Sequence, residues 1–248
     1  MGGGAAQKTR SLVGRVAVVA GASGGIGRAI TVALSREGTH VCALGRNPVT
    51  LAETVAATQQ YARAAAFQID SALEEDLQTV LQHLEEVRGL DILIHCAGVI
   101  HQDVMEHARV QDLDLQYSTN VRAPYLLTQR LLPLLITSRG QIVFINSSVA
   151  LAANRSNIGQ YAATKHALKA LAESLREEVN PKGVRVLSAY LGRTATPMQE
   201  ALFRAEGKTY HPETLLQPED VASMIVHALM LPSTAEVTDI NIRPMHKS

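Results

Sequence analysis

Two residues four positions apart, Tyr161 and Lys165, carry the strongest chemical signal in this 248-residue chain. At this spacing two side chains lie on one face of a helix. A neighbouring ammonium group favours the phenolate, and so lowers the pKa of a tyrosine from its free value of about 10. Such a phenol can exchange a proton with a substrate oxygen near neutral pH. With the hydroxyl pair Ser147-Ser148 just upstream, the pattern predicts general acid–base chemistry.

A glycine-rich turn near the N-terminus is a candidate phosphate-binding site. It follows a predicted strand at 16–20, precedes a predicted helix at 25–37, and has the spacing Gly-x-x-x-Gly-x-Gly. Glycine lets the backbone turn tightly and approach a ligand without a Cβ in the way. The N-terminus of the helix then offers free N–H groups to a phosphate. The residues expected to contact a dinucleotide here are Gly21, Ser23, Gly24, Gly25, Ile26 and Gly27.

The end of the second predicted strand indicates which dinucleotide is bound. NAD enzymes place an acid there for the ribose 2′-hydroxyl, whereas enzymes that use NADP place a basic group for the 2′-phosphate. This chain has Gly45-Arg46-Asn47 and no acid. The guanidinium fork suits a phosphate, so Arg46, with Asn47 beside it, favours NADP(H) over NAD(H). Asp70, at the end of the third predicted strand, either accepts a hydrogen bond from the adenine amino group or caps a loop.

These residues need a scaffold that brings strand ends together, and the hydrophobic pattern predicts one. Short apolar strands alternate with longer helical patterns, which is typical of a parallel sheet with right-handed crossovers. The predicted strands span 16–20, 40–44, 65–69, 91–95, 141–146, 184–190 and 237–242, and the main predicted helices span 25–37, 49–60, 74–87, 111–138, 159–180 and 218–230. We therefore expect an α/β fold, a doubly wound parallel seven-stranded sheet flanked by helices. It forms a single domain at 11–248 after a flexible tail at 1–10.

Composition argues against several classes of partner. The 23 basic residues balance the 23 acidic ones, which disfavours nucleic acid or an anionic membrane bound by bulk electrostatics. Cys42 and Cys96 lie in apolar runs without disulfide or metal-ligand spacing, and no metal is expected. No apolar run reaches the roughly 18 residues of a membrane span, and the start of the chain lacks the pattern of a signal peptide. A cytoplasmic protein is therefore expected.

In order and spacing, these motifs resemble those of the short-chain dehydrogenase/reductase family over about residues 12–243. The glycine motif matches Gly21, Gly25 and Gly27, and the Tyr-x-x-x-Lys motif matches Tyr161 and Lys165. The other matches are Ala97-Gly98 after the fourth strand, Asn120 in Ser118-Thr-Asn-Val, Ser148 thirteen residues before Tyr161, and Gly192, Thr194 and Thr196 after the sixth strand. The resemblance implies a Rossmann-type fold. It also implies that the cofactor is contacted by Ala97, Gly98, Tyr161, Lys165, Gly192, Thr194 and Thr196.

The resemblance also implies catalytic roles. Tyr161 would be the general acid toward a carbonyl oxygen and the general base in reverse. Lys165 would hold the nicotinamide ribose and lower the tyrosine pKa. Ser148 would hydrogen-bond the reacting oxygen, as an oxyanion donor does; Ser147 is its rival, which the spacing disfavours. Asn120 would hold a water molecule that links the lysine to solvent.

The chain departs from the family pattern in three places. His95 and Cys96 replace two asparagines, so the side-chain bonds that these usually make are missing or altered. Leu191 stands where proline is usual, and the Asp-Gly-Gly common near the C-terminus is absent. Asn146 is expected to satisfy backbone groups at the end of its strand.

The expected function is an NADP(H)-dependent oxidoreductase that interconverts a ketone or aldehyde and an alcohol, acting on a small molecule. The alternatives are a dinucleotide-binding sensor or scaffold without turnover, an NAD(H)-dependent alcohol dehydrogenase of the same fold, and a sugar-nucleotide epimerase or dehydratase. The segment 193–216 is expected to admit the substrate. An unusually apolar helix at 123–136 and the small residues of the tyrosine helix predict a homodimer or homotetramer with a two-fold interface.

Overall fold

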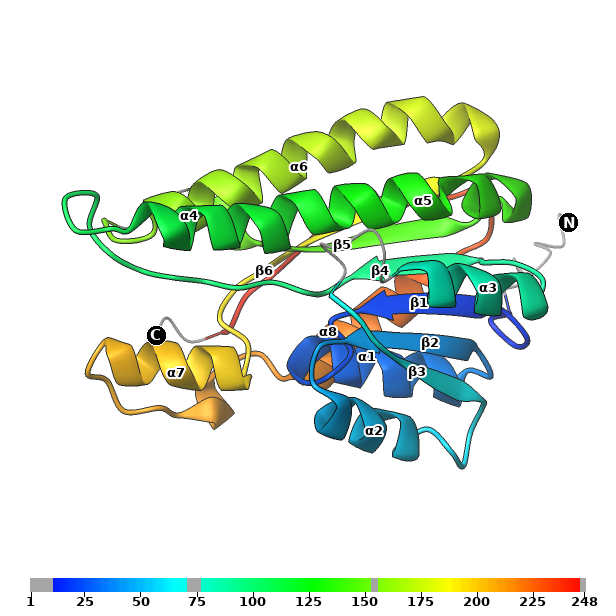
Figure 1. The fold of residues 1–248 in the computed structure, drawn as a ribbon, viewed down its shortest axis with the longest axis horizontal. Coiled ribbons are helices and arrows are strands. Elements are labelled where there is room, and N and C mark those ends of the chain that lie inside the picture. The colour runs from blue at the N-terminus through cyan, green and yellow to red at the C-terminus, as the bar shows by residue number, and fades with distance from the viewer. Residues whose placement is uncertain (1–10, 71–76, 153–155, 246–248) are drawn as a thin grey trace, which may run out of the picture.

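Seven strands form one parallel sheet (Figure 1). The computed structural model describes residues 11–70, 77–152 and 156–245. The strand order is β3-β2-β1-β4-β5-β6-β7. The strands are β1 (Val16–Ala20), β2 (His40–Gly45), β3 (Ala64–Gln68), β4 (Ile92–His95), β5 (Gln141–Ser147), β6 (Arg185–Leu191) and β7 (Asp239–Ile242). The predicted doubly wound sheet is confirmed, with each strand end within about two residues of its predicted place.

The sheet changes its winding direction at β1, which pairs with β2 on one side and β4 on the other. In such sheets ligands bind outside the carboxyl ends of the strands, at this switch point. The glycine-rich turn leaves the carboxyl end of β1, and the chain after β4 leaves beside it. The topology therefore brings the two segments to one edge of the sheet.

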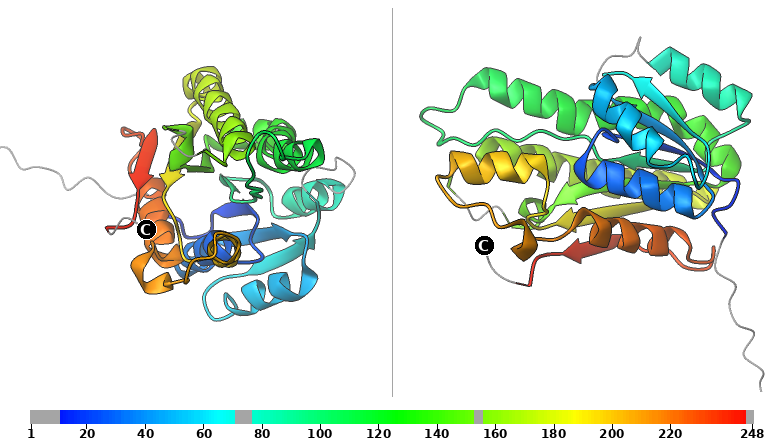
Figure 2. Two further views of the ribbon diagram at one scale, coloured as in Figure 1. Left: turned by 90° about the vertical axis from the view of Figure 1, so that its left-hand side faces the viewer. Right: turned by 90° about the horizontal axis from the view of Figure 1, so that it is seen from below.

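The helices cover both faces of the sheet (Figures 1 and 2). They are α1 (Gly25–Arg36), α2 (Pro48–Ala56), α3 (Gln78–Glu86), α4 (Val110–Tyr117), α5 (Ala123–Ser138), α6 (Gly159–Val179), α7 (Pro197–Ala205) and α8 (Pro218–Leu229). The first residues predicted for the third helix, and the tail at 1–10, lie outside the described residues. Helix α7 stands apart from the two layers, beyond the carboxyl end of β6 (Figure 1).

The long helix predicted at 111–138 contains a change of helical type. A π-helical turn, Ser118–Arg122, joins α4 to α5. Pro124 falls in the first turn of α5, where a missing N–H costs least. Pro133 lies inside α5 without ending it. Because π turns interrupt the regular backbone ladder, they are often found at functional sites, and this one carries Asn120.

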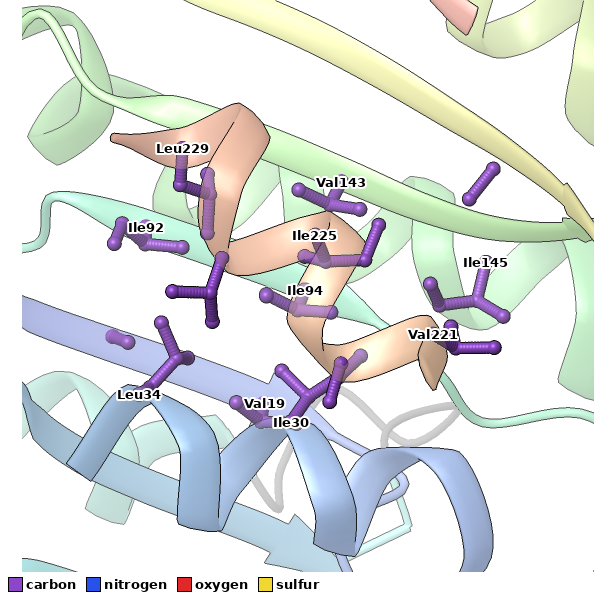
Figure 3. Close-up of a cluster of buried hydrophobic side chains, with 14 of the residues drawn as sticks. Val19, Ile30, Leu34, Ile92, Ile94, Val143, Ile145, Val221, Ile225 and Leu229 are labelled. Carbon is purple, nitrogen blue, oxygen red and sulfur yellow. The ribbon is translucent and has the colours of Figure 1, made fainter. Parts of the chain in front are cut away.

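Two aliphatic cores hold the layers together, one on each face of the sheet. The core under α1 and α8 contains Val19, Ile30, Leu34, Ile92, Ile94, Val143, Ile145, Val221, Ile225 and Leu229 (Figure 3). The opposite core contains residues of α3, α5 and α6, among them Val80, Leu84, Leu127, Leu131, Leu168 and Ala172. Each fully buried aliphatic side chain stabilises the fold by about 1.5–3 kcal/mol. Both cores extend to the carboxyl ends of the strands, through Ile145 and Leu191 in the first and Leu44 in the second.

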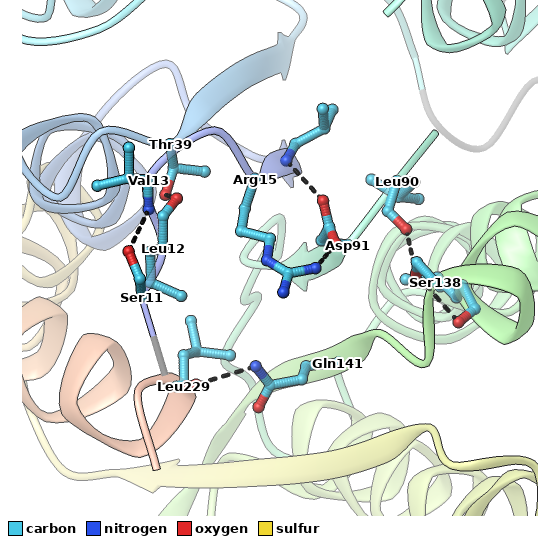
Figure 4. Close-up of polar contacts among 12 residues, drawn as sticks. Ser11, Leu12, Val13, Arg15, Thr39, Leu90, Asp91, Ser138, Gln141 and Leu229 are labelled. Carbon is cyan, nitrogen blue, oxygen red and sulfur yellow. Dashed lines mark hydrogen bonds and ion pairs between the residues drawn. The ribbon is translucent and has the colours of Figure 1, made fainter. Parts of the chain in front are cut away.

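Polar contacts fasten the opposite, amino-terminal edge of the sheet (Figure 4). The Asp91 carboxylate accepts hydrogen bonds from Arg15 Nη1 at 2.5 Å and from the Val16 amide at 2.9 Å. Gln141 Nε2 donates to the Leu229 carbonyl at 3.0 Å, which ties β5 to α8. This edge is therefore structural, and it leaves the carboxyl edge for chemistry. No described helix is both long and apolar enough to cross a membrane.

Candidate active site

The glycine-rich turn packs so closely on the chain after β4 that side chains are excluded. A Cβ on Gly21, whose φ is +85°, would lie 2.5 Å from the Ala97 amide nitrogen. A Cβ on Gly27 would lie 2.1 Å from the Gly21 carbonyl oxygen. Both distances are far below van der Waals contact, so larger residues would push the turn away from β4. The turn thus holds the first residues of α1 over the sheet edge.

A cavity of about 460 Å³ opens over this turn. Its walls contain these predicted dinucleotide contacts: Gly21, Ser23, Gly24, Gly25, Ile26, Gly27, Arg46, Asn47, Asp70, Ala97, Gly98 and Thr196. The buried Ser23 hydroxyl has no hydrogen-bond partner among the described residues, and such a group is normally satisfied by a ligand or by water. The backbone cradle and this unpaired hydroxyl fit the phosphates of a dinucleotide.

The rim of this cavity contains the residues that were predicted to discriminate between dinucleotides. Arg46 is exposed there, at the end of β2. Asn47 caps α2, because its Oδ1 accepts hydrogen bonds from the amides of Val49 and Thr50 at 3.0 and 3.2 Å. A Cβ on Gly45 would lie 2.0 Å from Ser23 Oγ. An acid at position 45 would therefore require Ser23 to move.

A second, smaller cavity of about 230 Å³ adjoins the first. It is lined by the remaining predicted site residues that face this edge, Ser148, Tyr161, Lys165, Gly192 and Thr194, together with Ser147. Ile26, Cys96, Gly98, Thr196 and Met198 line both cavities. A molecule in the smaller cavity therefore lies next to one end of a ligand in the larger one.

The electrostatics of the tyrosine–lysine pair differ from the expectation. Burial raises the pKa of Tyr161 to about 12, and a hydrogen bond with Ser147 opposes the rise. Burial also lowers the pKa of Lys165 to about 8. Lys165 Nζ donates to the Ile145 carbonyl at 3.2 Å and lies 5.8 Å from the centre of the tyrosine ring. The predicted lowering of the tyrosine pKa by the lysine is thus wrong for this structure, because burial outweighs it.

Ser147 affects the Tyr161 phenol, because it lowers the pKa of Tyr161 against the larger effect of burial. The Ser147 hydroxyl accepts a hydrogen bond from the Val149 amide at 3.4 Å. Ser148 lines the same cavity from the first position of a short 3-10 turn, Ser148–Ala150. Both serines therefore line the cavity, and the choice of Ser148 from sequence spacing stays a prediction.

Asn120 fixes the loop after β4 against the tyrosine helix. Its Oδ1 accepts from the Val99 amide at 2.9 Å, and its Nδ2 donates to the Val99 carbonyl at 2.9 Å and to Thr164 Oγ1 at 3.0 Å. The side chain is fully buried. Thr164, the residue before Lys165, is a partner that the sequence did not reveal. The expected water at Asn120 stays a prediction.

Further side chains complete the walls of the smaller cavity. Asn146 Nδ2 donates to the Lys165 carbonyl at 3.2 Å, and Asn146 Oδ1 accepts from the Ser147 amide at 2.8 Å, so Asn146 satisfies backbone groups as expected. Gln102, Met198 and Gln199 also line this cavity. Met198 and Gln199 lie in the segment 193–216 that was expected to admit the substrate, whereas no motif indicated Gln102, which lies on a loop.

His95 stands where the family has an asparagine, and its side chain makes different contacts. Its Nε2 lies 2.8 Å from Thr128 Oγ1 on α5, and its ring stacks on Phe144 at 4.8 Å between centroids. Burial lowers the pKa of His95 to about 3, so the ring is neutral. Burial raises the pKa of the neighbouring Cys96 thiol to about 12. The substitution therefore exchanges strand-end hydrogen bonds for a link between β4 and α5.

Comparison with known proteins agrees with this geometry. The family model of short chain dehydrogenases matches residues 15–207. The chain belongs to this family. It is 31% identical over 234 residues to an uncharacterized oxidoreductase of Staphylococcus epidermidis, covering 93% of this chain and 97% of the relative. It is also 31% identical over 244 residues to glycine betaine reductase of Emericella nidulans, but covers only 19% of that much longer protein.

Solved structures of this family superpose on the whole sheet. A dehydrogenase/reductase from Sinorhizobium meliloti has a TM-score of 0.82 and 30% identity, with 94% of each chain covered. A short chain dehydrogenase from Burkholderia cenocepacia in complex with NADP has a TM-score of 0.82 and 26% identity, covering 94% of this chain and 98% of the other. One from Mycobacterium paratuberculosis bound to NAD shares the fold, with a TM-score of 0.84 and 24% identity over 94% and 97% of the chains. The chain is therefore a short-chain oxidoreductase with dinucleotide-binding neighbours of both kinds.

Proposed function

We propose that this short-chain dehydrogenase interconverts a ketone or aldehyde and an alcohol, with NADP(H) as cofactor and Tyr161 as the acid–base group. The observation that carries the proposal is the junction of the two cavities. Tyr161, Ser147 and Lys165 line the smaller cavity, which shares Cys96, Gly98 and other lining residues with the larger cavity. A carbonyl carbon seated there would lie between a hydride source and a proton donor.

Each residue of the site would have its own role in the reaction. A reduced nicotinamide held in the larger cavity would supply the hydride, which is chemistry the protein itself lacks. Tyr161, protonated at neutral pH because its pKa is about 12, would donate a proton to the carbonyl oxygen. The Ser147 hydroxyl would hydrogen-bond the same oxygen as negative charge develops on it. Lys165 and Thr194 would orient the ribose and the carboxamide of the cofactor.

The preference for NADP(H) rests on the end of β2. Arg46 is exposed at the rim of the cavity, and the crowding of Gly45 against Ser23 disfavours an acid at position 45. A guanidinium group at this edge would pair with a 2′-phosphate in a charge-assisted hydrogen bond. The Burkholderia relative in complex with NADP is consistent with such a site.

Replacing Tyr161 with phenylalanine tests the acid–base role. Tyr161→Phe should lower kcat for reduction of a panel of carbonyl compounds by about 10²–10⁴-fold, because the positioned proton donor is lost. The Kd for NADPH, measured by fluorescence titration, should stay near the wild-type value because the ring remains. Wild-type protein that oxidises NADPH with none of the carbonyls would favour the alternative of a non-catalytic sensor. A variant as active as the wild type would remove Tyr161 from the mechanism.

Replacing Arg46 tests the cofactor preference. Arg46→Ala should lower kcat/KM for NADPH by about 10- to 100-fold, the value of a hydrogen bond to a charged group. It should leave kcat/KM for NADH almost unchanged, because NADH has no 2′-phosphate. Exposed Arg204, which does not line the cavity, provides a matched control. Equal use of both cofactors by the wild type would refute the preference.

A further inference from the structure

Three residues that line the smaller cavity each have a buried polar atom without a hydrogen-bond partner among the described residues. The atoms are Arg193 Nη1, Gln199 Oε1 and Gln102 Nε2. Tyr161 and Ser147 line the same cavity. A buried polar group left unpaired is unfavourable, and more so when it is charged. An apolar carbonyl compound would offer these three residues no partner, so we expect a substrate with a polar group.

Arg193 is fixed in one position by its neighbours. Its Nη2 donates to the two carboxylate oxygens of Glu206 at 2.8 and 3.0 Å. Its guanidinium carbon lies 4.6 Å from the centre of the Phe203 ring. The side chains of Arg193 and Glu206 are only 14% and 10% exposed. These contacts hold a rigid, planar donor group in the wall of the cavity.

The charges around Arg193 leave a positive excess. Lys208 Nζ lies 2.9 Å from Glu206 Oε2, so two cations share a single carboxylate. The described lining of the cavity contains the cations Arg193 and Lys165 and no acidic side chain. An anionic ligand group would therefore meet attraction at Arg193, whereas a cationic one would meet repulsion.

We propose that the substrate of this enzyme carries a carboxylate, which Arg193 binds while the carbonyl lies at Tyr161. The inference rests on the proposed function and deepens it to a substrate class: short oxo-carboxylates, reduced to hydroxy-carboxylates. The cavity of about 230 Å³ limits the substrate to a small molecule. Gln102 Nε2 is a further donor for the carboxylate, whereas the unpaired Gln199 Oε1 can only accept and would bind a hydroxyl group. The hydride goes to the carbonyl carbon, the Tyr161 proton goes to its oxygen, and the carboxylate is unchanged.

Matched substrates test the proposal. Oxo-carboxylates of three to six carbons are each compared with their methyl esters, with NADPH as reductant. For the best acid, kcat/KM should exceed that of its ester by about 10- to 100-fold. In Arg193→Met this ratio should fall toward one through a higher KM for the acid, with the ester little affected. Arg204→Met, a change of an exposed arginine on α7 outside the cavity, should keep the wild-type ratio.

Two further variants separate recognition from folding damage. Arg193→Met removes a partner of the buried Glu206, so Arg193→Met/Glu206→Gln is measured beside it and should show the same lost ratio. Glu206→Gln alone removes the carboxylate that competes for Arg193, and should lower the KM for the acid. Binding without turnover is read from thermal unfolding: a short hydroxy-carboxylate should raise Tm in the wild type and not in Arg193→Met.

The outcomes distinguish this inference from the proposed function. Turnover of acids and esters with equal kcat/KM would overturn the carboxylate site and leave the oxidoreductase function intact. Preference for an aldehyde that carries a trimethylammonium group would also overturn it. Failure to reduce any carbonyl compound with either cofactor would overturn the function and the inference together.

Discussion

The surroundings of the Tyr161 side chain keep its phenol protonated. Burial sets its pKa at about 12 and sets that of Lys165 at about 8. At neutral pH the phenol therefore keeps its proton and the lysine keeps its charge. The protonated phenol is the form that the proposed reduction of a carbonyl requires.

The two adjacent serines offer a test of which hydroxyl assists Tyr161. Ser147→Ala should lower kcat/KM by about 10²-fold, the usual cost of losing one oxyanion donor. Ser148→Ala should leave kcat/KM near the wild-type value, because Ser147 and not Ser148 affects the pKa of the Tyr161 phenol. Steady-state kinetics on one carbonyl substrate suffices for both variants.

A control variant is needed because Ser147 also accepts a hydrogen bond from the Val149 amide. Ser147→Thr keeps a hydroxyl at this position and should recover part of the activity. If Ser148→Ala were the more damaging change, the thirteen-residue spacing would be the better guide to the catalytic serine.

Site residues were predictable from sequence where the backbone itself makes the site. Gly21 and Gly27 were found because only glycine fits their close contacts, and Tyr161 and Lys165 because helical spacing fixes their relation. The choice between Ser147 and Ser148 stays open, because both line the cavity. Arg193 and Gln199 lie in the segment 193–216 that was expected to admit the substrate, but no motif gave either residue a role of its own, because their position depends on how α7 packs at the end of the sheet.

At the scale of elements, β4 and α5 are joined by a neutral buried histidine. The pKa of His95 is about 3 in the fold and about 6.5 in an unfolded chain. Between these values the unfolded chain binds a proton that the folded chain does not. The free energy of unfolding therefore falls as the pH falls from 6.5 toward 3, by about 1.4 kcal/mol per pH unit at most.

His95→Asn, which restores the family residue, should remove this loss. Urea unfolding at pH 7, 6, 5 and 4 should show a flatter pH dependence for the variant than for the wild type. At pH 7 the variant should be less stable, because the stacking of His95 on Phe144 is lost. His107→Asn, a change of an exposed histidine, should follow the wild-type curve. Parallel curves for His95→Asn and wild type would show that His95 takes up its proton without unfolding.

At the scale of the whole molecule, the alternation of strands and helices was enough to predict the sheet. The aliphatic runs of β1, β4, β5 and β6 are buried on both faces, so their sequence is unambiguous. The π-helical turn at Ser118–Arg122 was not predictable, because no residue type marks it. The electrostatics were also beyond sequence reasoning, since the Tyr161 pKa depends on burial by segments distant in the chain.

The oligomeric state of the protein remains a prediction. The outer face of α5 and α6 is the surface that we expect to form the interface. A groove between these helices is lined by apolar side chains that the chain covers only in part, including Leu132, Leu171 and Leu175. Tyr125, 54% exposed, lies at the same groove. Because a two-fold axis would place this face against its own copy, we expect a homodimer or homotetramer that buries it.

Light scattering at micromolar concentration tests this assembly with a pair of matched variants. The wild type should have the mass of a dimer or tetramer. Tyr125→Asp should shift the mass toward that of the monomer, because a carboxylate buried in an apolar interface loses its hydration. Val49→Asp, an equally exposed change on α2 at a different side of the sheet (Figure 1), should leave the mass unchanged. A wild-type monomer, or equal dissociation of both variants, would remove the α5–α6 face as the interface.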